Sequence, residues 1–504
     1  MIELMILNQI SNQLYMMYAG SAPQLISCGS HDLSHIQDTT EACLLLKTIQ
    51  QNESCVPEFH VQFSSVNYEM GYYCERTKIV KYSISIQMIG LMIGAVLFGQ
   101  LSDSFGRKPA MIGALICTNL FMVASSFTHS LFWFTLFRFF VNIFNAGSIA
   151  VLLIYSLEIL PVKDRYWINN AVGWSPNMIV LAFMAYVSGD WKTLTRLSAL
   201  LSIPAFIVCC LVDESPRYLV HIGKLAEAKA VLQRIYRIDK RKCNEDLLDF
   251  VLDKENRAYL EKHSKSKKYT FLHLFYTPDL TRYTLAIAFS FLVTSIINYA
   301  LVFNIEKLAG SIYVNAILLG IVRYLSGLVI SFLEVRIKCL GRKMVHFGAL
   351  STCAICAFLF FMASVTGHHK EMAILLRYGA VFIIGVGAQL YLVNGICAGE
   401  LFPTCIRNLA YSFGQFHTRI GVVLAPQIFF LADVWTSLPY LAMFLLVIAD
   451  MIFFQLNIKE TKNNPLSDHM PGEEESWFGR KKRNRAAAAQ LLRSDLEANE
   501  KANP

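Results

Sequence analysis

The sequence GQLSDSFGRK at residues 99–108 is a short charged link. It begins at the end of one strongly apolar stretch, residues 82–102, and leads into a second, residues 109–127. Its last three residues recur as Gly341-Arg342-Lys343, again between two apolar stretches. Each flanking stretch has about 20 residues, the length that a helix needs to cross the ~30 Å hydrocarbon core of a bilayer. The link therefore predicts a loop between two membrane-spanning helices.

The whole chain has the composition of a membrane protein. Of its 504 residues, 55% are hydrophobic and 16% are charged, whereas a soluble protein carries roughly a quarter charged residues. The net charge of +8 does not indicate nucleic acid, because the basic residues lie between and after apolar stretches. We expect an all-α protein of about twelve spans, near residues 1–20, 82–102, 109–127, 131–157, 168–188, 194–212, 281–303, 311–333, 345–365, 373–396, 409–431 and 437–457.

The first of these spans is the poorest, since it carries Glu3, Asn8, Asn12 and Gln13. A signal peptide is the competing interpretation, but the stretch has neither a basic beginning nor a clear cleavage site. The start of the natural protein is expected to be abbreviated in this sequence.

The polar segments predict how the chain is oriented. Residues 213–280 and the tail 458–504 are rich in Lys and Arg, so the positive-inside rule places both in the cytoplasm. With an even number of spans, both termini are cytoplasmic and the loop 21–81 is extracellular, which favours the plasma membrane. That loop holds Asn52-Glu53-Ser54, a glycosylation pattern that chance also produces, and four cysteines that favour disulfides whose pairing stays open: Cys28, Cys43, Cys55 and Cys74.

A second motif is repeated at the same interval. Glu158-x-x-Pro161-x-x-x-Arg165 follows the fourth span, and Glu400-x-x-Pro403-x-x-x-Arg407 follows the tenth. Two matches in the same order, each six spans apart, indicate duplication. The domains are then an N-terminal half (1–212, with the loop 21–81), a cytoplasmic linker (213–280), a C-terminal half (281–457) and a cytoplasmic tail (458–504).

This plan resembles the major facilitator superfamily, whose two six-helix halves enclose a substrate site near the midplane. The link at residues 99–108 is similar to the superfamily's loop motif, except that Ser104 stands at a position that is usually basic. We expect a cytoplasmic gate network that latches the halves in one state, although plain solvation of interfacial charges is the alternative. Its members are Asp103, Arg107, Glu158, Arg165, Glu400 and Arg407.

Further motifs resemble one family within it, the organic cation, anion and carnitine transporters. They are ELFPTCIRN at residues 400–408, DESPRYL at 213–219, and the segments YALVFN at 299–304 and GSIYVN at 310–315. The resemblance covers nearly the whole chain and implies transport of a small organic ion across a lipid bilayer.

Two arginines indicate which ion. Arg419 lies ten residues into its span, and at 1.5 Å per residue that is ~15 Å, half of the ~30 Å apolar core. In the family this position is basic in the anion and carnitine branches. Arg323 also lies near mid-span, whereas Arg138 and Arg377 fall near outer helix ends and are expected to snorkel. For both mid-span arginines, an internal ion pair is the alternative to substrate binding.

Three aromatic residues fall at positions that resemble cavity-lining sites of the family, namely Trp174, Tyr299 and Tyr391, and Asn12 is expected to add a hydrogen bond. Core packing or lipid contact is the simpler interpretation of any one of them. We expect no cofactor and no metal, because no P-loop, nucleophile–base set or metal-ligand spacing occurs. The preferred function is organic-anion transport by alternating access, with a coupling counter-ion or an exchanged dicarboxylate as a further partner. Carnitine or cation transport stays open, and a receptor or scaffold is a more distant alternative.

Overall fold

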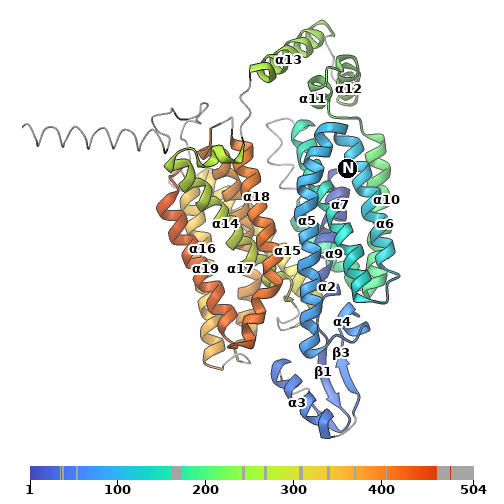
Figure 1. Cartoon of the computed structure of the whole chain (residues 1–504), viewed down its shortest axis with the longest axis vertical. Helices are drawn as coiled ribbons and strands as arrows, with labels where there is room; N and C mark the ends of the chain where they lie inside the picture. The colour runs from blue at the N-terminus through green and yellow to red at the C-terminus, as the bar shows by residue number, and fades with distance from the viewer. Residues whose placement is uncertain are drawn as a thin grey trace, which may run out of the picture.

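The computed structural model describes the chain except residues 34–35, 37–38, 53–54, 160–172, 241–244, 266–269, 306–309, 338–340, 368–370, 404–405, 462–470, 472–476 and 478–504. Its helices form two bundles that stand side by side (Figure 1). The N-terminal bundle contains α1 (Ile2–Gln13), α2 (Met16–Ala19), α5 (Thr77–Phe105), α6 (Arg107–Ser125), α7 (Leu131–Ile159), α9 (Trp174–Ser188) and α10 (Trp191–Leu211). The C-terminal bundle contains α14 (Pro278–Val302), α15 (Ile312–Arg336), α16 (Arg342–Val365), α17 (Ala373–Leu401), α18 (Arg407–Leu424), η4 (Ala425–Asp433) and α19 (Leu438–Asn457).

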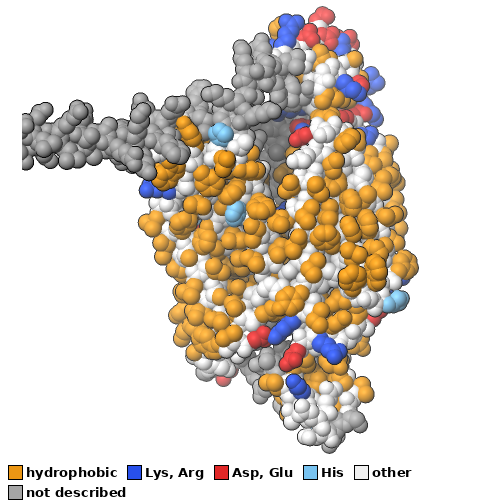
Figure 2. All heavy atoms as spheres, viewed as in Figure 1, with side chains coloured by type: hydrophobic (Ala, Val, Ile, Leu, Met, Phe, Trp, Pro, Cys, Tyr) orange, Lys and Arg blue, Asp and Glu red, His pale blue; other side chains and the backbone are white. Residues whose placement is uncertain are grey.

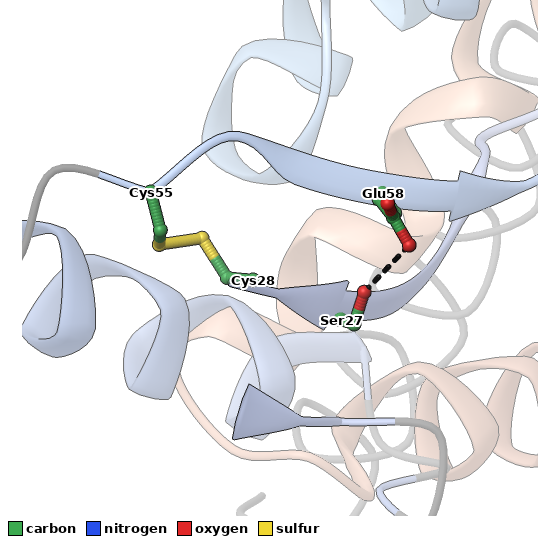
Figure 3. Close-up of a disulfide and its surroundings, with 4 residues drawn as sticks. All are labelled: Ser27, Cys28, Cys55 and Glu58. Atoms are coloured by element: carbon green, nitrogen blue, oxygen red, sulfur yellow. Dashed lines mark hydrogen bonds between the residues drawn. A yellow bond between two sulfur atoms is a disulfide. The ribbon is translucent and has the colours of Figure 1, made fainter. Parts of the chain in front are cut away.

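One end of the molecule, which we call the sheet end, carries the loop that precedes α5. Its antiparallel sheet has the strand order β2-β1-β3, made of β1 (Gln24–Cys28), β2 (His31–Asp32) and β3 (Pro57–His60). Three short helices complete it: α3 (Thr39–Asn52), α4 (Val66–Glu69) and η1 (Cys74–Arg76). Disulfides join Cys28 to Cys55, as Figure 3 shows, and Cys43 to Cys74. Asn52 is exposed at the end of α3, while Ser54 of its glycosylation pattern lies outside the described residues.

The opposite end, which we call the linker end, carries the polar segment between the two bundles (Figure 1). Three amphipathic or polar helices, α11 (Pro216–His221), α12 (Leu225–Ile238) and α13 (Glu245–Lys265), stand beyond the N-terminal bundle, and η2 (Phe271–Phe275) leads into α14. A small apolar cluster that includes Leu219, Ala228 and Leu252 holds α11, α12 and α13 together.

Nine helices in the described part of the chain are long and apolar enough to cross a membrane. The predicted spans at 1–20, 168–188 and 409–431 are not among the nine. They correspond to α1 with α2, to α9 and to α18 with η4, which are interrupted, short or polar. Exposed side chains on the long helices are mainly apolar, as Figure 2 shows, which is the surface that lipid requires. The membrane fold agrees with the prediction, and the number twelve stays a prediction.

Glycines allow α5 and α7 to pack with their backbones close together. A Cβ at Gly90 would lie 2.5 Å from the carbonyl oxygen of Phe139, and one at Gly94 would overlap the carbonyl oxygen of Ile143. Across the same contact, Gly147 of α7 lies against the ring of Phe98. Small residues at such contacts replace the hydrophobic driving force that helices lack in lipid.

Replacing Gly94 with alanine should therefore destabilise the N-terminal bundle. The new methyl group forces α5 and α7 apart, and overpacking of this kind costs about 1–3 kcal/mol. Gly99→Ala is the matched control, because it lies on the same helix with open space around its Cβ position. Thermal unfolding of the detergent-solubilised protein measures the difference, and equal melting temperatures for the two variants would contradict this packing.

The two bundles meet through α5 on α18 and through α9 on α15. Hydrogen bonds between them gather toward the sheet end. Ser85 donates to the carbonyl oxygen of Val423 at 2.7 Å and accepts from Gln427 at 2.8 Å, and Lys81 donates to the carbonyl oxygen of Phe303 at 2.5 Å. Among the described residues, the two bundles are thus joined by hydrogen bonds near the sheet end.

Candidate functional site

Four of the residues predicted to line a cavity come together in the C-terminal bundle. Tyr299 of α14 and Tyr391 of α17 each interact electrostatically with both guanidinium groups, those of Arg323 on α15 and Arg419 on α18. All four side chains keep some exposed surface although protein surrounds them. We call these four residues the central cluster.

Close helix contacts fix the two arginines of the central cluster in place. Ser295 of α14 donates to the carbonyl oxygen of Thr418 at 2.8 Å, which sets the next residue, Arg419, beside the helix that carries Tyr299. On the other side, Gly385 of α17 lies so close to α15 that a Cβ there would be 3.3 Å from the backbone nitrogen of Arg323. Helix packing therefore fixes the backbone positions from which both arginine side chains extend.

Neither guanidinium group of the central cluster forms an ion pair or a hydrogen bond with another described residue, although the backbone carbonyl oxygen of Arg323 accepts from Ser326 at 3.0 Å. The Asp450 carboxyl group, which is buried in the same bundle, contacts Ser290 instead. The internal ion pair that the sequence left open is thus not formed within the described part of the chain. Both positive charges interact with the same two tyrosines, Tyr299 and Tyr391.

Gln13 links the central cluster to the N-terminal bundle, a role that we expected of its neighbour Asn12. The Gln13 amide donates to the Tyr299 hydroxyl at 2.6 Å. Asn12 is buried and turned away: it donates to the carbonyl oxygen of Asn8 at 2.9 Å, and its own oxygens accept from Arg138 at 2.8 and 3.3 Å. The structure does not bring Asn12 to the central cluster.

The expectation that Arg138 snorkels is wrong. This side chain is fully buried, and its guanidinium lies over the Tyr15 ring at 4.1 Å. The cause is the interruption between α1 and α2 at Leu14 and Tyr15, since a helix end leaves its last carbonyl groups without helical partners. Arg138 donates to one of these, that of Asn12, so it stabilises the break in the first span.

Trp174 lies on the other bundle at a depth close to that of Arg323. It is the first residue of α9, which runs antiparallel to α15: Tyr186 contacts Tyr313, and Ser175 and Ile179 face Gly320. Arg323 is one turn beyond Gly320 toward the linker end, and Trp174 precedes Ser175 in the same direction. Trp174 is half-buried and packs against the apolar core.

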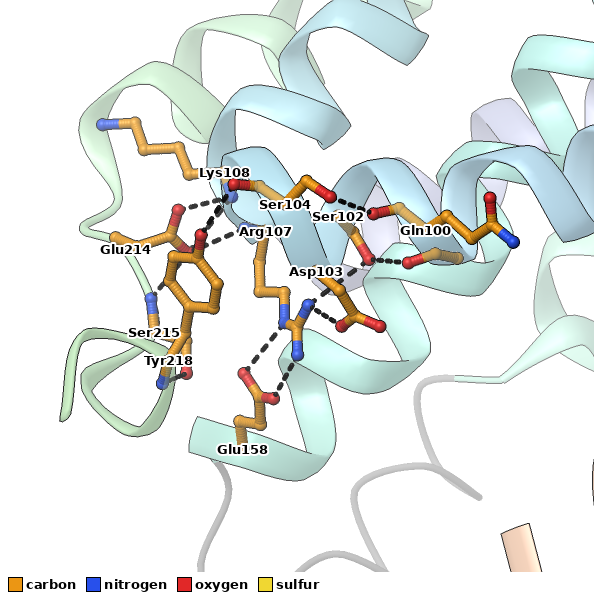
Figure 4. A network of polar contacts seen from close by, with 11 residues as sticks. Gln100, Ser102, Asp103, Ser104, Arg107, Lys108, Glu158, Glu214, Ser215 and Tyr218 are labelled. Carbon is orange, nitrogen blue, oxygen red and sulfur yellow. Dashed lines mark hydrogen bonds and ion pairs between the residues drawn. The ribbon is translucent and has the colours of Figure 1, made fainter. Parts of the chain in front are cut away.

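At the linker end, three of the predicted gate residues, Asp103, Arg107 and Glu158, belong to one network (Figure 4). Arg107 donates to Asp103 at 2.5 Å and to Glu158 at 3.2 Å. Glu214 accepts from the backbone nitrogens of Arg107 and Lys108 at 3.1 Å, which caps the N-terminus of α6. Tyr218 of α11 lies under the Arg107 guanidinium at 5.1 Å, and burial raises the pKa of its phenol.

The C-terminal half repeats this arrangement. Glu460 accepts from the backbone nitrogens of Arg342 and Lys343 at 2.9 and 3.1 Å, and the Arg342 side chain lies 3.7 Å from Glu400. In both halves a glycine makes room for the capping carboxylate, because a Cβ at Gly106 or Gly341 would overlap it. Glu214 and Glu460 were missed as network members, although a Glu-Ser and a Glu-Thr pair after the sixth and twelfth predicted spans signal them.

Arg165 lies outside the described residues, and Arg407 does not join these networks. The Nε and Nη2 atoms of Arg407 are buried without a hydrogen-bond partner among the described residues, so no contact with Glu400 is seen. The networks of the two halves are separate in this conformation, and the latch between halves stays a prediction.

Replacing Glu158 with glutamine should weaken the network of the N-terminal half. The Arg107 and Glu158 side chains are only 10% and 12% exposed, and a hydrogen bond to a charged group contributes about 1.5–3 kcal/mol. The variant should therefore melt at a lower temperature than the wild type. Asp253→Asn, an exposed carboxylate on α13, is the control and should melt like the wild type. An unchanged melting temperature for Glu158→Gln would show that the ion pair adds nothing.

Comparison with known proteins agrees with this architecture. A family model described as "Sugar (and other) transporter" matches residues 44–470. Solute carrier family 22 member 16 of Xenopus laevis is 27% identical over 417 residues, covering 81% of this chain and 70% of that protein. The organic cation transporter-like protein of Drosophila melanogaster is 26% identical over 477 residues, covering 92% and 82% of the two chains. Organic anion transporter 3 of Oryctolagus cuniculus is 28% identical over 430 residues, covering 81% and 74%.

Among solved structures, the inward-open xylose transporter XylE from E. coli matches with a TM-score of 0.64 and 15% identity, over 94% of this chain and 99% of that chain. Its partially occluded inward-open form matches with a TM-score of 0.59 and 14% identity, over 92% and 99%. At such low identity these matches show the fold alone.

Proposed function

The chain belongs to the sugar (and other) transporter family, and we propose that the solutes it carries across the membrane are small organic anions. The relatives reported above include transporters named for organic anions and for organic cations, and both classes fit the fold. The choice between them depends on the charge of the site.

The observation that carries the proposal is the pair of unpaired guanidinium groups in the central cluster. Arg323 and Arg419 keep exposed surface, and neither pairs with another described carboxylate. A charged side chain deep in a membrane is costly and marks a substrate or ion pathway. A guanidinium binds a carboxylate or sulfonate through two parallel hydrogen bonds. Two such groups also suit a dicarboxylate, which is a reasonable exchange partner.

The rest of the cluster suits an anion with a flat ring. Tyr299 and Tyr391 supply aromatic faces and hydroxyl groups beside the arginines. Trp174, at a similar depth on the facing bundle, supplies a further aromatic side chain. Sites for small molecules commonly combine such apolar walls with a few polar groups that fix orientation.

The proposed mechanism is alternating access by rocking of the two bundles. Among the described residues, hydrogen bonds join the bundles near the sheet end, which supports a carrier whose bundles separate at the opposite end. We place the linker end in the cytoplasm of a plasma-membrane protein, because the linker and tail are basic and the sheet end carries two disulfides. The networks around Arg107 and Arg342 are free to meet when the linker end closes.

Replacing Arg419 with glutamine should weaken the binding of an organic anion by about 10- to 150-fold, the loss expected for a charged hydrogen bond of about 1.5–3 kcal/mol. The probe is a labelled aromatic sulfonate, and the readout is its concentration dependence of uptake into vesicles that contain the purified protein. Arg419→Lys should retain an intermediate affinity, because it keeps the charge but loses the two-fold hydrogen bonding.

Arg377→Gln is the matched control, since Arg377 lies near the sheet end and donates to Asn315. It should transport the sulfonate with wild-type affinity. If Arg419→Gln took up the sulfonate with the affinity of the wild type, the assignment of organic anions as substrates would be wrong. Uptake of carnitine or of a quaternary ammonium ion by the wild type, without uptake of the sulfonate, would instead establish one of the alternative substrates.

A disulfide between the two bundles at the sheet end should stop transport if the bundles rock against each other. Ser85 and Gln427 face each other across α5 and η4, with Oγ and Nε2 2.8 Å apart. The double variant Ser85→Cys, Gln427→Cys should lose most sulfonate uptake after oxidation and regain it after gentle reduction.

Each single-cysteine variant is a control for the effect of oxidation on the native cysteines, and neither should respond. Full uptake by the cross-linked double variant would show that the sheet end does not open during transport.

A further inference from the structure

Four buried polar side chains meet inside the C-terminal bundle, where α14, α16, α17 and α19 pack together. Ser290 is at the centre: its Oγ lies 2.9 Å from His346 Nε2, 2.9 Å from Asn394 Nδ2 and 3.0 Å from Asp450 Oδ2. All four side chains are fully buried, and the Phe454 ring stacks on His346 at 3.5 Å. We call these four residues the serine cluster.

The transport mechanism described above does not use the serine cluster. Its residues do not contact Arg323 or Arg419, and they have no exposed surface from which a solute could be reached. Yet an ionisable side chain inside a membrane bundle is expensive to keep, and its default interpretation is a functional site. Asp450 and His346 are two such side chains in one place.

Hydrogen-bond accounting shows what the cluster can hold. A serine hydroxyl donates one hydrogen bond and accepts two, and Asn394 already donates to it. Two arrangements satisfy the other two contacts. Either Ser290 donates to an Asp450 carboxylate and accepts from His346, or a protonated Asp450 donates to Ser290, which then donates to His346.

The two arrangements use the same contacts and differ by one proton. Without that proton, the Asp450 carboxylate is a buried anion with a single hydrogen bond, because its Oδ1 has no partner among the described residues. A buried charge without a counter-charge is costly, and such a group is stable only when neutralised. With the proton, no side chain of the cluster is charged.

We propose that the serine cluster is a proton-binding site and that the transport cycle exchanges the proton held there; this extends the proposed transport function. A proton arrives at His346 Nδ1, which is buried without a hydrogen-bond partner among the described residues. The proton on Nε2 passes to Ser290 Oγ as the serine proton passes to Asp450 Oδ2. One proton is gained, and histidine ends neutral with its hydrogen on Nδ1.

The position of His346 suits proton entry from the linker end. It lies one turn after Arg342, so about 6 Å separates it from the start of α16 at 1.5 Å per residue. Full burial closes the site in the present conformation. Exchange with water therefore requires a movement of the surrounding helices, which links protonation to the conformational cycle.

No described charged side chain on the neighbouring helices contacts the cluster, so the proton is its source of neutralisation. The other titratable groups on these elements include two thiols on the same helix faces, since Cys397 is one turn from Asn394 and Cys353 is two turns from His346. The full set is Asp279, Arg282, Tyr283 and Tyr299 on α14, Arg342, Lys343, Cys353 and Cys356 on α16, Arg377, Tyr378, Tyr391, Cys397 and Glu400 on α17, Arg407, Tyr411, His417 and Arg419 on the adjoining α18, Asp433 on η4 and Tyr440 on α19.

Two of the four helices of the serine cluster, α14 and α17, also carry residues of the central cluster, which gives the proton a route to influence transport. Asn394 is one turn from Tyr391 on α17, and Ser290 shares α14 with Tyr299. Reversing the hydrogen bonds at Ser290 changes how α14 is tied to α16 and α19. A proton fits this site better than a metal cation, because two nitrogens at 2.9 Å already occupy the serine oxygen.

Infrared spectroscopy of the purified full-length protein tests the site without any transported solute. The wild type should show the carbonyl stretch of a protonated carboxyl group at neutral pH, and this band should vanish on going to alkaline pH. Asp450→Asn, which has nearly the same size and is neutral, should lack the band. Asp279→Asn, an exposed carboxylate at the start of α14, should keep it.

Two results would overturn the proposal: no protonated carboxyl group in the wild type at neutral pH, or an unchanged band in Asp450→Asn. The first result is read from the wild-type spectrum alone, so the proposal can be tested even if the Asp450→Asn variant does not fold. A band that responds to sodium and not to pH would also overturn it. The infrared experiment does not depend on the proposal that the protein transports organic anions. A failure of sulfonate uptake would contradict that proposal and leave the infrared result unchanged.

Transport then tests the coupling. Asp450→Asn mimics the protonated state, so it should still exchange labelled for unlabelled sulfonate across vesicles, while its net uptake should lose the pH dependence of the wild type. A one-proton site changes wild-type net uptake by at most about tenfold per pH unit. If net sulfonate uptake by Asp450→Asn depended on pH as it does in the wild type, protonation of the serine cluster would not be coupled to transport.

Discussion

The cost of removing a positive charge from water shapes the centre of this molecule. An arginine at the middle of a membrane helix costs about 2.5–3.5 kcal/mol on insertion scales. Arg323 and Arg419 avoid part of this cost because they keep some exposed surface and interact electrostatically with Tyr299 and Tyr391. Since no described carboxylate neutralises them, an anionic solute is the natural partner that completes the site.

The same solution appears twice at the linker end. In each half a carboxylate caps the helix that follows the Gly-Arg motif, α6 or α16. An arginine of that helix lies beside a glutamate near the end of the next helix, α7 or α17. These contacts connect helices within each half. The described hydrogen bonds that join the two halves lie mainly near the sheet end. Such an arrangement favours rigid bundles that move relative to each other, and the proposed proton site lies inside one of these bundles.

Sequence reasoning predicted what local patterns encode. Apolar stretches located the long helices, and the repeated Gly-Arg-Lys and Glu-x-x-Pro motifs located Arg107 with Glu158. In the C-terminal half they located Glu400, but the predicted network named Arg407 and missed Arg342, which lies beside Glu400 in the structure. It failed where the outcome depends on helix rotation, because one residue turns a side chain by about 100°. Gln13 and not Asn12 therefore reaches Tyr299, and Arg138 is buried by a helix break that no motif signals. The serine cluster needs four helices to meet, so no single stretch indicates it.

The most direct test of the central claim is a flux measurement on the wild-type protein in vesicles, with a labelled aromatic sulfonate, carnitine and a quaternary ammonium ion supplied separately. Two unneutralised arginines predict saturable uptake of the sulfonate, competition by other organic anions and no uptake of the quaternary ammonium ion. Saturable uptake of the quaternary ammonium ion without uptake of the sulfonate would contradict the account.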